Sequence, residues 1–146
     1  MYAVDALDKA VPLSGIPLPD TGAPLPKLTA DEHETRVTYY VSSRSSSEDG
    51  LRTTVAFLGC YALLFGPPND EAFDGHPLAD RGLASYGTFE VEQSSWVRTL
   101  ERMNRVHSRH KPESFSHLRH FVITFHDSTF ECIAAGFSVL PALPAV

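Results

Sequence analysis

Hydrophobic and polar positions alternate in three parts of the chain, and this period of two is typical of half-buried β-strands. The three parts are residues 35–44, 84–93 and 120–139. The third is long enough for two strands, and Asp127-Ser128 near its middle has turn chemistry. The pattern therefore predicts two single strands and one closing hairpin.

Residues 53–65 are apolar on every face, so periodicity alone does not separate a buried strand from a buried helix. A helix is favoured by Thr53 at the start and by Gly66-Pro67 as a stop signal. A strand is favoured by the turn-forming sequence at 45–50, which would join this segment to residues 35–44 as a hairpin. We prefer the central strand.

The clearest helical pattern follows the second strand. Ser94 or Ser95 can cap it, and Trp96, Leu100 and Met103 recur at helical spacing. The helix should end before Pro112 and pack across one face of the sheet, with Trp96 buried at its start and Met103 at its centre.

Together these elements predict an α+β domain, an antiparallel sheet of about five strands in the order β-β-loop-β-α-β-β with one amphipathic helix. Five of the eleven prolines lie within residues 12–26, which predicts an extended, proline-rich arm over residues 1–33. The arm is either a flexible tail or docked through its Leu and Ile side chains, and we expect partial docking. The domain would then span residues 34–140, with an irregular tail at 141–146.

Composition narrows the class of protein. With 146 residues and 42% hydrophobic positions the chain can bury one core. A net charge of −6 argues against nucleic-acid binding, and no apolar run reaches the length that spans a membrane. The acidic start is unlike a secretory signal, and Cys60 and Cys132 lie in apolar runs, so we expect a small soluble cytoplasmic protein with reduced thiols.

The closing hairpin offers the first candidate chemistry. A loop at Asp127-Ser128 would place Phe125 opposite Phe130 and Thr124 opposite Glu131. Alternation then gives the hairpin one face for the core, made of Phe121, Ile123, Phe125, Phe130, Cys132 and Ala134. The other face would be polar near the turn, where it carries Thr124, His126, Thr129 and Glu131.

His126 and Glu131 would be diagonal neighbours on that polar face, close enough to couple. The long irregular segment 67–83 adds Asp70 as a further carboxylate. The hypothesis for catalysis is therefore His126 as general base with Glu131 or Asp70 as its partner. The residues expected to contact a ligand beside them are Asn69, Glu71, His76, Thr124 and Thr129. The alternative is that all of these are solvated side chains on an open sheet face.

The residue pattern gives little support for a metal site or for a cofactor site. Five of the seven histidines lie between His107 and His126, but strand and helix geometry keeps them apart. The Asp/Glu/His residues of segment 67–83 lack a recognised metal spacing, and no phosphate-binding or nucleophile motif is present. We expect neither a metal nor an organic cofactor.

Four arginines follow one another at spacings of 4, 3 and 4 along the predicted helix, opposite its apolar side. Such a row could dock an acidic partner or a phosphorylated ligand. It could equally be a solvated face whose arginines pair with acids of the same molecule. The residues of this row are Arg98, Arg102, Arg105 and Arg109.

Three functions remain after these exclusions. The leading one is a binding or interaction module that recognises a small molecule or a protein through the final hairpin and the 67–83 loop. The second is an acid–base enzyme without cofactor, and the third an inhibitor or immunity-type protein. The sequence leaves oligomeric state open. The deciding observation is whether His126, Glu131 and the 67–83 loop meet in one concave pocket.

Overall fold

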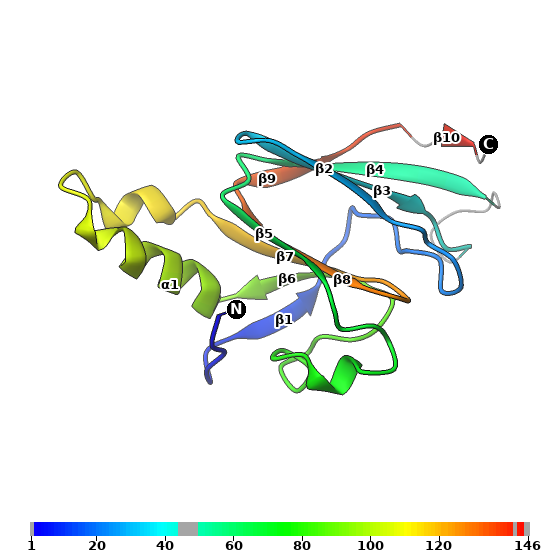
Figure 1. Ribbon diagram of the computed structural model, residues 1–146, viewed down its shortest axis with the longest axis horizontal. Helices are drawn as coiled ribbons and strands as arrows, with labels where there is room; N and C mark the ends of the chain where they lie inside the picture. The colour runs from blue at the N-terminus through cyan, green and yellow to red at the C-terminus, as the bar shows by residue number, and fades with distance from the viewer. Residues whose placement is uncertain (1, 44–49, 142, 145–146) are drawn as a thin grey trace.

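The computed structural model describes residues 2–43, 50–141 and 143–144, and Figure 1 shows the arrangement of its elements. The turn expected at 45–50 lies largely outside the described residues. The strands are β1 (Lys9–Pro12), β2 (Lys27–Ala30), β3 (Glu34–Tyr40), β4 (Leu51–Leu58), β5 (Ala62–Gly66), β6 (Thr88–Glu92), β7 (Arg119–Thr124), β8 (Thr129–Ala134), β9 (Gly136–Val139) and β10 (Leu143–Pro144). The helices are α1 (Ser95–Met103) and the single 3-10 turns Phe73–Gly75, Asn104–Val106 and Pro112–Phe115.

The described strands form two antiparallel sheets, so the fold is α+β as expected, but the expected single sheet is wrong. The first sheet has the order β1-β6-β7-β8-β5, and the second has the order β10-β4-β3-β2, with β9 also paired to β4. The apolar run 53–65 is extended, as we preferred. It is two strands, because Gly59 has a φ of 61° and turns the chain from β4 in the second sheet to β5 in the first.

Residues 2–33 contribute one strand to each sheet, which corrects the prediction of a proline-rich arm that merely precedes the fold. β1 pairs with β6 along the edge of the first sheet, and β2 pairs with β3 along the edge of the second. Between them Ile16 is only 5% exposed and lies in the main core. The prolines interrupt this segment without excluding it, because short edge strands tolerate a residue that lacks an N–H.

The main core lies between the two sheets. Phe57 of β4 has its ring centroid 5.4 Å from that of Phe121 and 5.3 Å from that of Phe130 on the first sheet. All six residues predicted for the inner face of the closing hairpin belong to this cluster. Alternation therefore assigned the core face of β7 and β8 correctly.

The register of that hairpin differs from the prediction by two residues. Thr124 lies opposite Thr129, where we expected Glu131. The N–H of Phe125 donates to the carbonyl of Ser128 at 2.8 Å, so the two-residue turn is His126-Asp127. A shift of two keeps every side chain on its predicted face, whereas a shift of one would have reversed the faces.

The second face of the first sheet is covered, so the alternative of solvated side chains on an open sheet face does not hold for Thr124, Thr129 and Glu131. Tyr2, Leu78 and Trp96 pack there against Val122 and Ile133 in a second buried cluster. The segments that supply this cover are the N-terminus, the 67–83 loop and the first turn of α1.

Helix α1 begins as predicted and ends earlier. The hydroxyl of Ser94 accepts a hydrogen bond from the N–H of Val97, and Trp96 is buried. Met103 is 65% exposed, which contradicts its predicted place at a buried centre. Only the start of the helix lies over the sheet, and its outer half projects from the body of the molecule, as Figure 1 shows.

Docking of residues 1–33 can be tested by shortening two of their side chains. Ile16→Ala should lower the free energy of unfolding by about 2–5 kcal/mol, because it leaves a cavity in the main core. Leu25→Ala should lower it by less than about 0.5 kcal/mol, because Leu25 is 62% exposed. Denaturant melts measure both, and equal effects of the two substitutions would contradict docking.

Candidate functional site

The residues proposed for catalysis fall into two separate polar centres. His126 lies in the hairpin turn and contacts Asp70, whereas Glu131 lies within β8 and contacts His76. The structure therefore does not join His126 and Glu131. The register shift is the reason, since it moves His126 out of the strand and into the turn.

The first centre is exposed and joins Asp70, Tyr86 and His126 from three segments. His126 Nδ1 lies 3.1 Å from Asp70 Oδ2, and the side chain of His126 is 39% exposed. The Tyr86 hydroxyl donates to the Asp70 carboxylate and lies 3.3 Å from His126 Nδ1. That hydrogen bond lowers the pKa of Asp70 and raises the pKa of Tyr86, so the pair stays carboxylate and phenol.

The backbone around the exposed centre holds it in place. Tyr86 has a φ of 56°, and its ring stacks on that of His126 with 6.2 Å between centroids. The N–H of Asp70 also donates to the carbonyl of His126 at 2.9 Å, which joins the 67–83 loop to the hairpin.

The orientation of the imidazole in the exposed centre suits acid–base chemistry, but its exposure to solvent does not. A carboxylate at Nδ1 orients an imidazole so that Nε2 faces outward. Here Nε2 lies 3.8 Å from Asp127, whose side chain is 87% exposed. The side chain of His126 is 39% exposed, so solvent reaches the imidazole.

The second centre is buried around Glu131, which is 2% exposed. The Glu131 carboxylate lies 2.8 Å from His76 Nε2, 2.8 Å from His120 Nε2 and 2.5 Å from the hydroxyl of Tyr2. His76 Nδ1 accepts from the N–H of Leu78 at 3.0 Å, so its Nε2 carries the proton and donates to Glu131.

The electrostatics of the buried centre favour a charged carboxylate. Burial by itself raises the pKa of Glu131, but the hydrogen bonds from His120 and His76, together with the electrostatic attraction of these two side chains, bring the pKa to about 2. Burial, followed by the charge of Glu131, raises the pKa of Tyr2 well above its ordinary value. The phenol therefore remains a donor.

The buried centre is hardly exposed to solvent: Tyr2, the most exposed of its four residues, is 7% exposed. The ring of Tyr2 stacks on Trp96 with 5.1 Å between centroids, and His120 meets both rings edge-on. His120 Nδ1 lies 2.7 Å from the Ser94 hydroxyl at the start of α1. This centre joins the N-terminal segment, the loop and the helix to the sheet.

Tyr2 and His120 were not expected from the sequence as partners of Glu131. The signal for His120 was available, because alternation along the predicted hairpin places His120 and Glu131 on the same face. No local pattern could indicate Tyr2, which is 129 residues from Glu131 in the sequence.

The residues proposed for ligand binding mostly hold the loops together. Thr124 donates to the carbonyl of Ala84 at 2.7 Å, and Thr129 donates to that of Pro68 at 2.9 Å. The side chain of Asn69 accepts from the N–H of Ala72 at 2.9 Å, whereas Glu71 is exposed.

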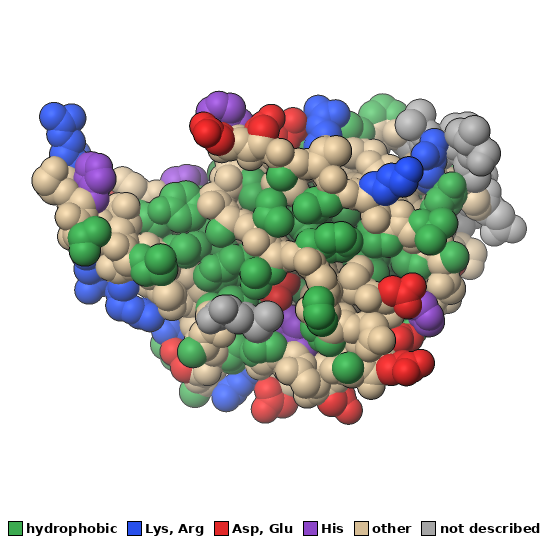
Figure 2. Space-filling model, viewed as in Figure 1, with side chains coloured by type: hydrophobic (Ala, Val, Ile, Leu, Met, Phe, Trp, Pro, Cys, Tyr) green, Lys and Arg blue, Asp and Glu red, His purple; other side chains and the backbone are tan. Residues whose placement is uncertain are grey.

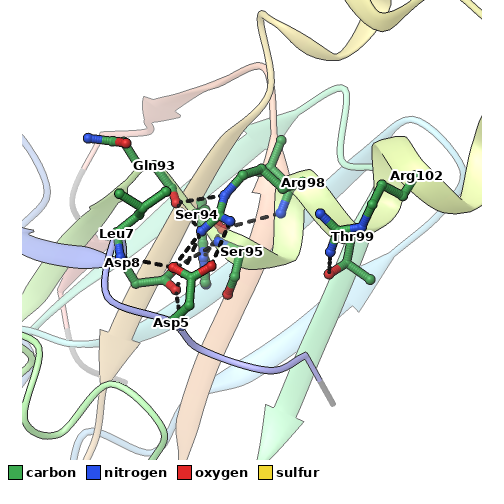
Figure 3. A network of polar contacts seen from close by, with 11 residues as sticks. Asp5, Leu7, Asp8, Gln93, Ser94, Ser95, Arg98, Thr99 and Arg102 are labelled. Carbon is green, nitrogen blue, oxygen red and sulfur yellow. Dashed lines mark hydrogen bonds and ion pairs between the residues drawn. The ribbon is translucent and has the colours of Figure 1, made fainter.

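Two arginines of the row, Arg98 and Arg105, form ion pairs with acids of the same molecule. Arg98 donates to both carboxylate oxygens of Asp5, at 2.7 and 2.9 Å, as Figure 3 shows, and Arg105 pairs with Glu101 at 2.8 Å. Arg102 contacts only the hydroxyl of Thr99 in that view, and among the described residues neither Arg102 nor Arg109 forms an ion pair. The outer part of the row is thus available for a partner.

Within the described residues no group of three or more His, Cys, Asp or Glu side chains could hold a metal ion. Among the helices of that same part of the chain, none has the length and apolar character to cross a membrane. No family model, curated protein or solved structure matches the chain.

The buried centre makes a testable prediction about pH. The pKa of Glu131 in the folded protein is lowered from 4.5 to about 2, so its stabilising contribution is complete above pH 4.5 and is lost as the pH falls towards 2. Glu131→Gln should therefore lose several kcal/mol of stability at neutral pH and progressively less against the wild type below pH 4.5.

Urea melts across this pH range measure the difference, with Glu71→Gln as the exposed control that should leave stability unchanged. A gap between wild type and Glu131→Gln that stays constant from neutral pH to pH 2.5 would contradict the account.

Proposed function

We propose that the chain is a protein-interaction module, and that its binding surface is the outer part of α1 and the turn after it. We call this the helix surface and define it as Leu100, Arg102, Met103, Val106 and Arg109. One observation carries the proposal: Met103 is 65% and Val106 94% exposed on a segment that projects from the body of the molecule. Exposed apolar side chains on a projecting helix are typical of protein-binding surfaces.

Charge indicates the chemistry of the partner. The chain as a whole has a net charge of −6, but residues 98–111 hold five bases and one acid. Figure 2 shows Lys and Arg side chains along the margin of the projecting segment, with hydrophobic side chains beside them. An acidic protein segment with apolar side chains complements this arrangement. Both cysteines are free, in keeping with a cytoplasmic setting.

A second candidate is the acid–base function at Asp70, Tyr86 and His126. The observation that favours it is convergence, because catalytic groups usually come from separate segments as these three do. Recognition of a small ligand by the hairpin and the 67–83 loop would use the same side chains. The exposure of the His126 side chain to solvent makes this the weaker proposal.

Site-specific photo-cross-linking tests the helix surface. A photoreactive residue in place of Val106 should capture one acidic protein from an extract of the source cells. One in place of Leu25, which is 62% exposed just before β2, should not. The captured protein, purified, should then bind the wild type and lose at least about tenfold in affinity for Met103→Glu or Arg102→Glu.

Arg98→Glu is not a suitable control, because Arg98 holds the N-terminus through Asp5. Lys27→Glu on β2 is a suitable one and should leave affinity unchanged. Equal capture at positions 106 and 25, or unchanged affinity of the helix variants, would contradict the proposal.

A further inference from the structure

Strand β5 lies at the end of the first sheet and has one free edge. It pairs with β8 on one side, and none of the described strands pairs with it on the other. The N–H and C=O groups that point away from β8 therefore form an unpaired row, which is a template for a further strand.

The composition of β5 lacks the usual protection of an edge. The strand reads Ala-Leu-Leu-Phe-Gly and carries no charge, whereas the edge strands β1 and β2 each begin with a lysine. Phe65 is 43% exposed, and Tyr61 just before the strand is 51% exposed. Figure 2 shows hydrophobic side chains gathered over this part of the molecule, at the centre of the face in view.

We propose that β5 pairs in antiparallel fashion with β5 of a second copy of this chain, so that two five-stranded sheets become one continuous sheet. The inference rests on the strand edge and does not require that the helix surface bind an acidic protein, although Leu100 and Met103 lie near both. A two-fold axis through Leu64 would place Leu64 opposite Leu64 of the partner subunit, and Leu63 opposite Phe65 of the partner subunit. Every cross-strand pair beside the axis is then apolar, and no like charges meet.

A second copy fits this edge better than an unrelated strand for two reasons. A neutral apolar strand is complementary to itself, so the same patch serves both subunits of a symmetric dimer. Leu64 also lines a hollow of about 270 Å³ with Tyr2, Trp96, Leu100 and Met103. At the axis each Leu64 lies beside this hollow, so apolar contact can extend from the paired strands onto α1.

The test measures molecular mass by sedimentation velocity from low to high micromolar concentration. The wild type should be a dimer at the upper end, and Phe65→Lys should raise the dissociation constant at least tenfold, because each lysine would face an apolar strand across the axis. Leu58→Lys is the matched control, since Leu58 of β4 is 44% exposed on the second sheet, and it should associate as the wild type does. A wild type that stays monomeric, or equal weakening by both variants, would overturn the proposal.

A disulfide tests the position of the axis and covers the case in which Phe65→Lys fails to fold. In a Cys60→Ser background, Leu64→Cys places the new thiol opposite its own mate, with Cα atoms within the range that a disulfide needs. Mild oxidation should give a covalent dimer for Leu64→Cys and much less for Phe65→Cys, which lies away from the axis. No covalent dimer, or equal yields from both positions, would overturn the pairing. The two proposals can fail separately. If the chain dimerises but its helix surface binds no acidic protein, this inference holds and only the proposed function is rejected.

Discussion

The buried carboxylate of Glu131 sets the arrangement of everything on the outer face of the first sheet. A charged group in the interior is tolerated only when donors surround it, and removing one donor leaves the charge uncompensated. The three donors here are Tyr2, His76 and His120, which lie far apart in the sequence. The N-terminus and the 67–83 loop must therefore fold over the sheet to supply them. The same requirement places the start of α1, because Ser94 contacts His120 and Trp96 stacks on Tyr2.

The segments that cover the outer face of the first sheet limit which surfaces can bind another molecule. Both faces of the strands β7 and β8 are buried, one against the second sheet and the other under the cover around Glu131. These two strands thus offer no open face for a ligand. Besides the exposed centre around His126, two features can serve recognition: the part of α1 beyond its anchored first turn and the free edge of β5. Both carry exposed apolar side chains, and both differ in composition from the polar surface expected of a solvated helix or a protected edge.

Much of the fold could be predicted from the sequence wherever a local pattern determines the structure. Alternation identified the core face of the closing hairpin, and the cap at Ser94 located the start of α1. The strands β1 and β2 were missed because four residues among prolines show no periodicity. Met103 was misplaced because helical spacing shows which side is apolar but not how far the sheet extends beneath it.

The structure brings together several residues that the sequence pointed to, but the sequence did not determine which of them pair. Asp70 and His126 do meet, and so do His76 and Glu131, but the sequence offered no way to tell which histidine belongs to which carboxylate. That choice depends on the path of the 67–83 loop, and tertiary contacts determine this path. Tyr2 could not be foreseen for the same reason.

The most direct test of this account is the protonation of the two imidazoles around Glu131, measured by long-range ¹H–¹⁵N correlation NMR of the wild type at neutral pH. The account predicts that both His76 and His120 carry a slowly exchanging proton on Nε2, and that Nδ1 of His76 is unprotonated because it accepts from Leu78. An unprotonated Nε2 on either ring, or a proton on Nδ1 of His76, would contradict it.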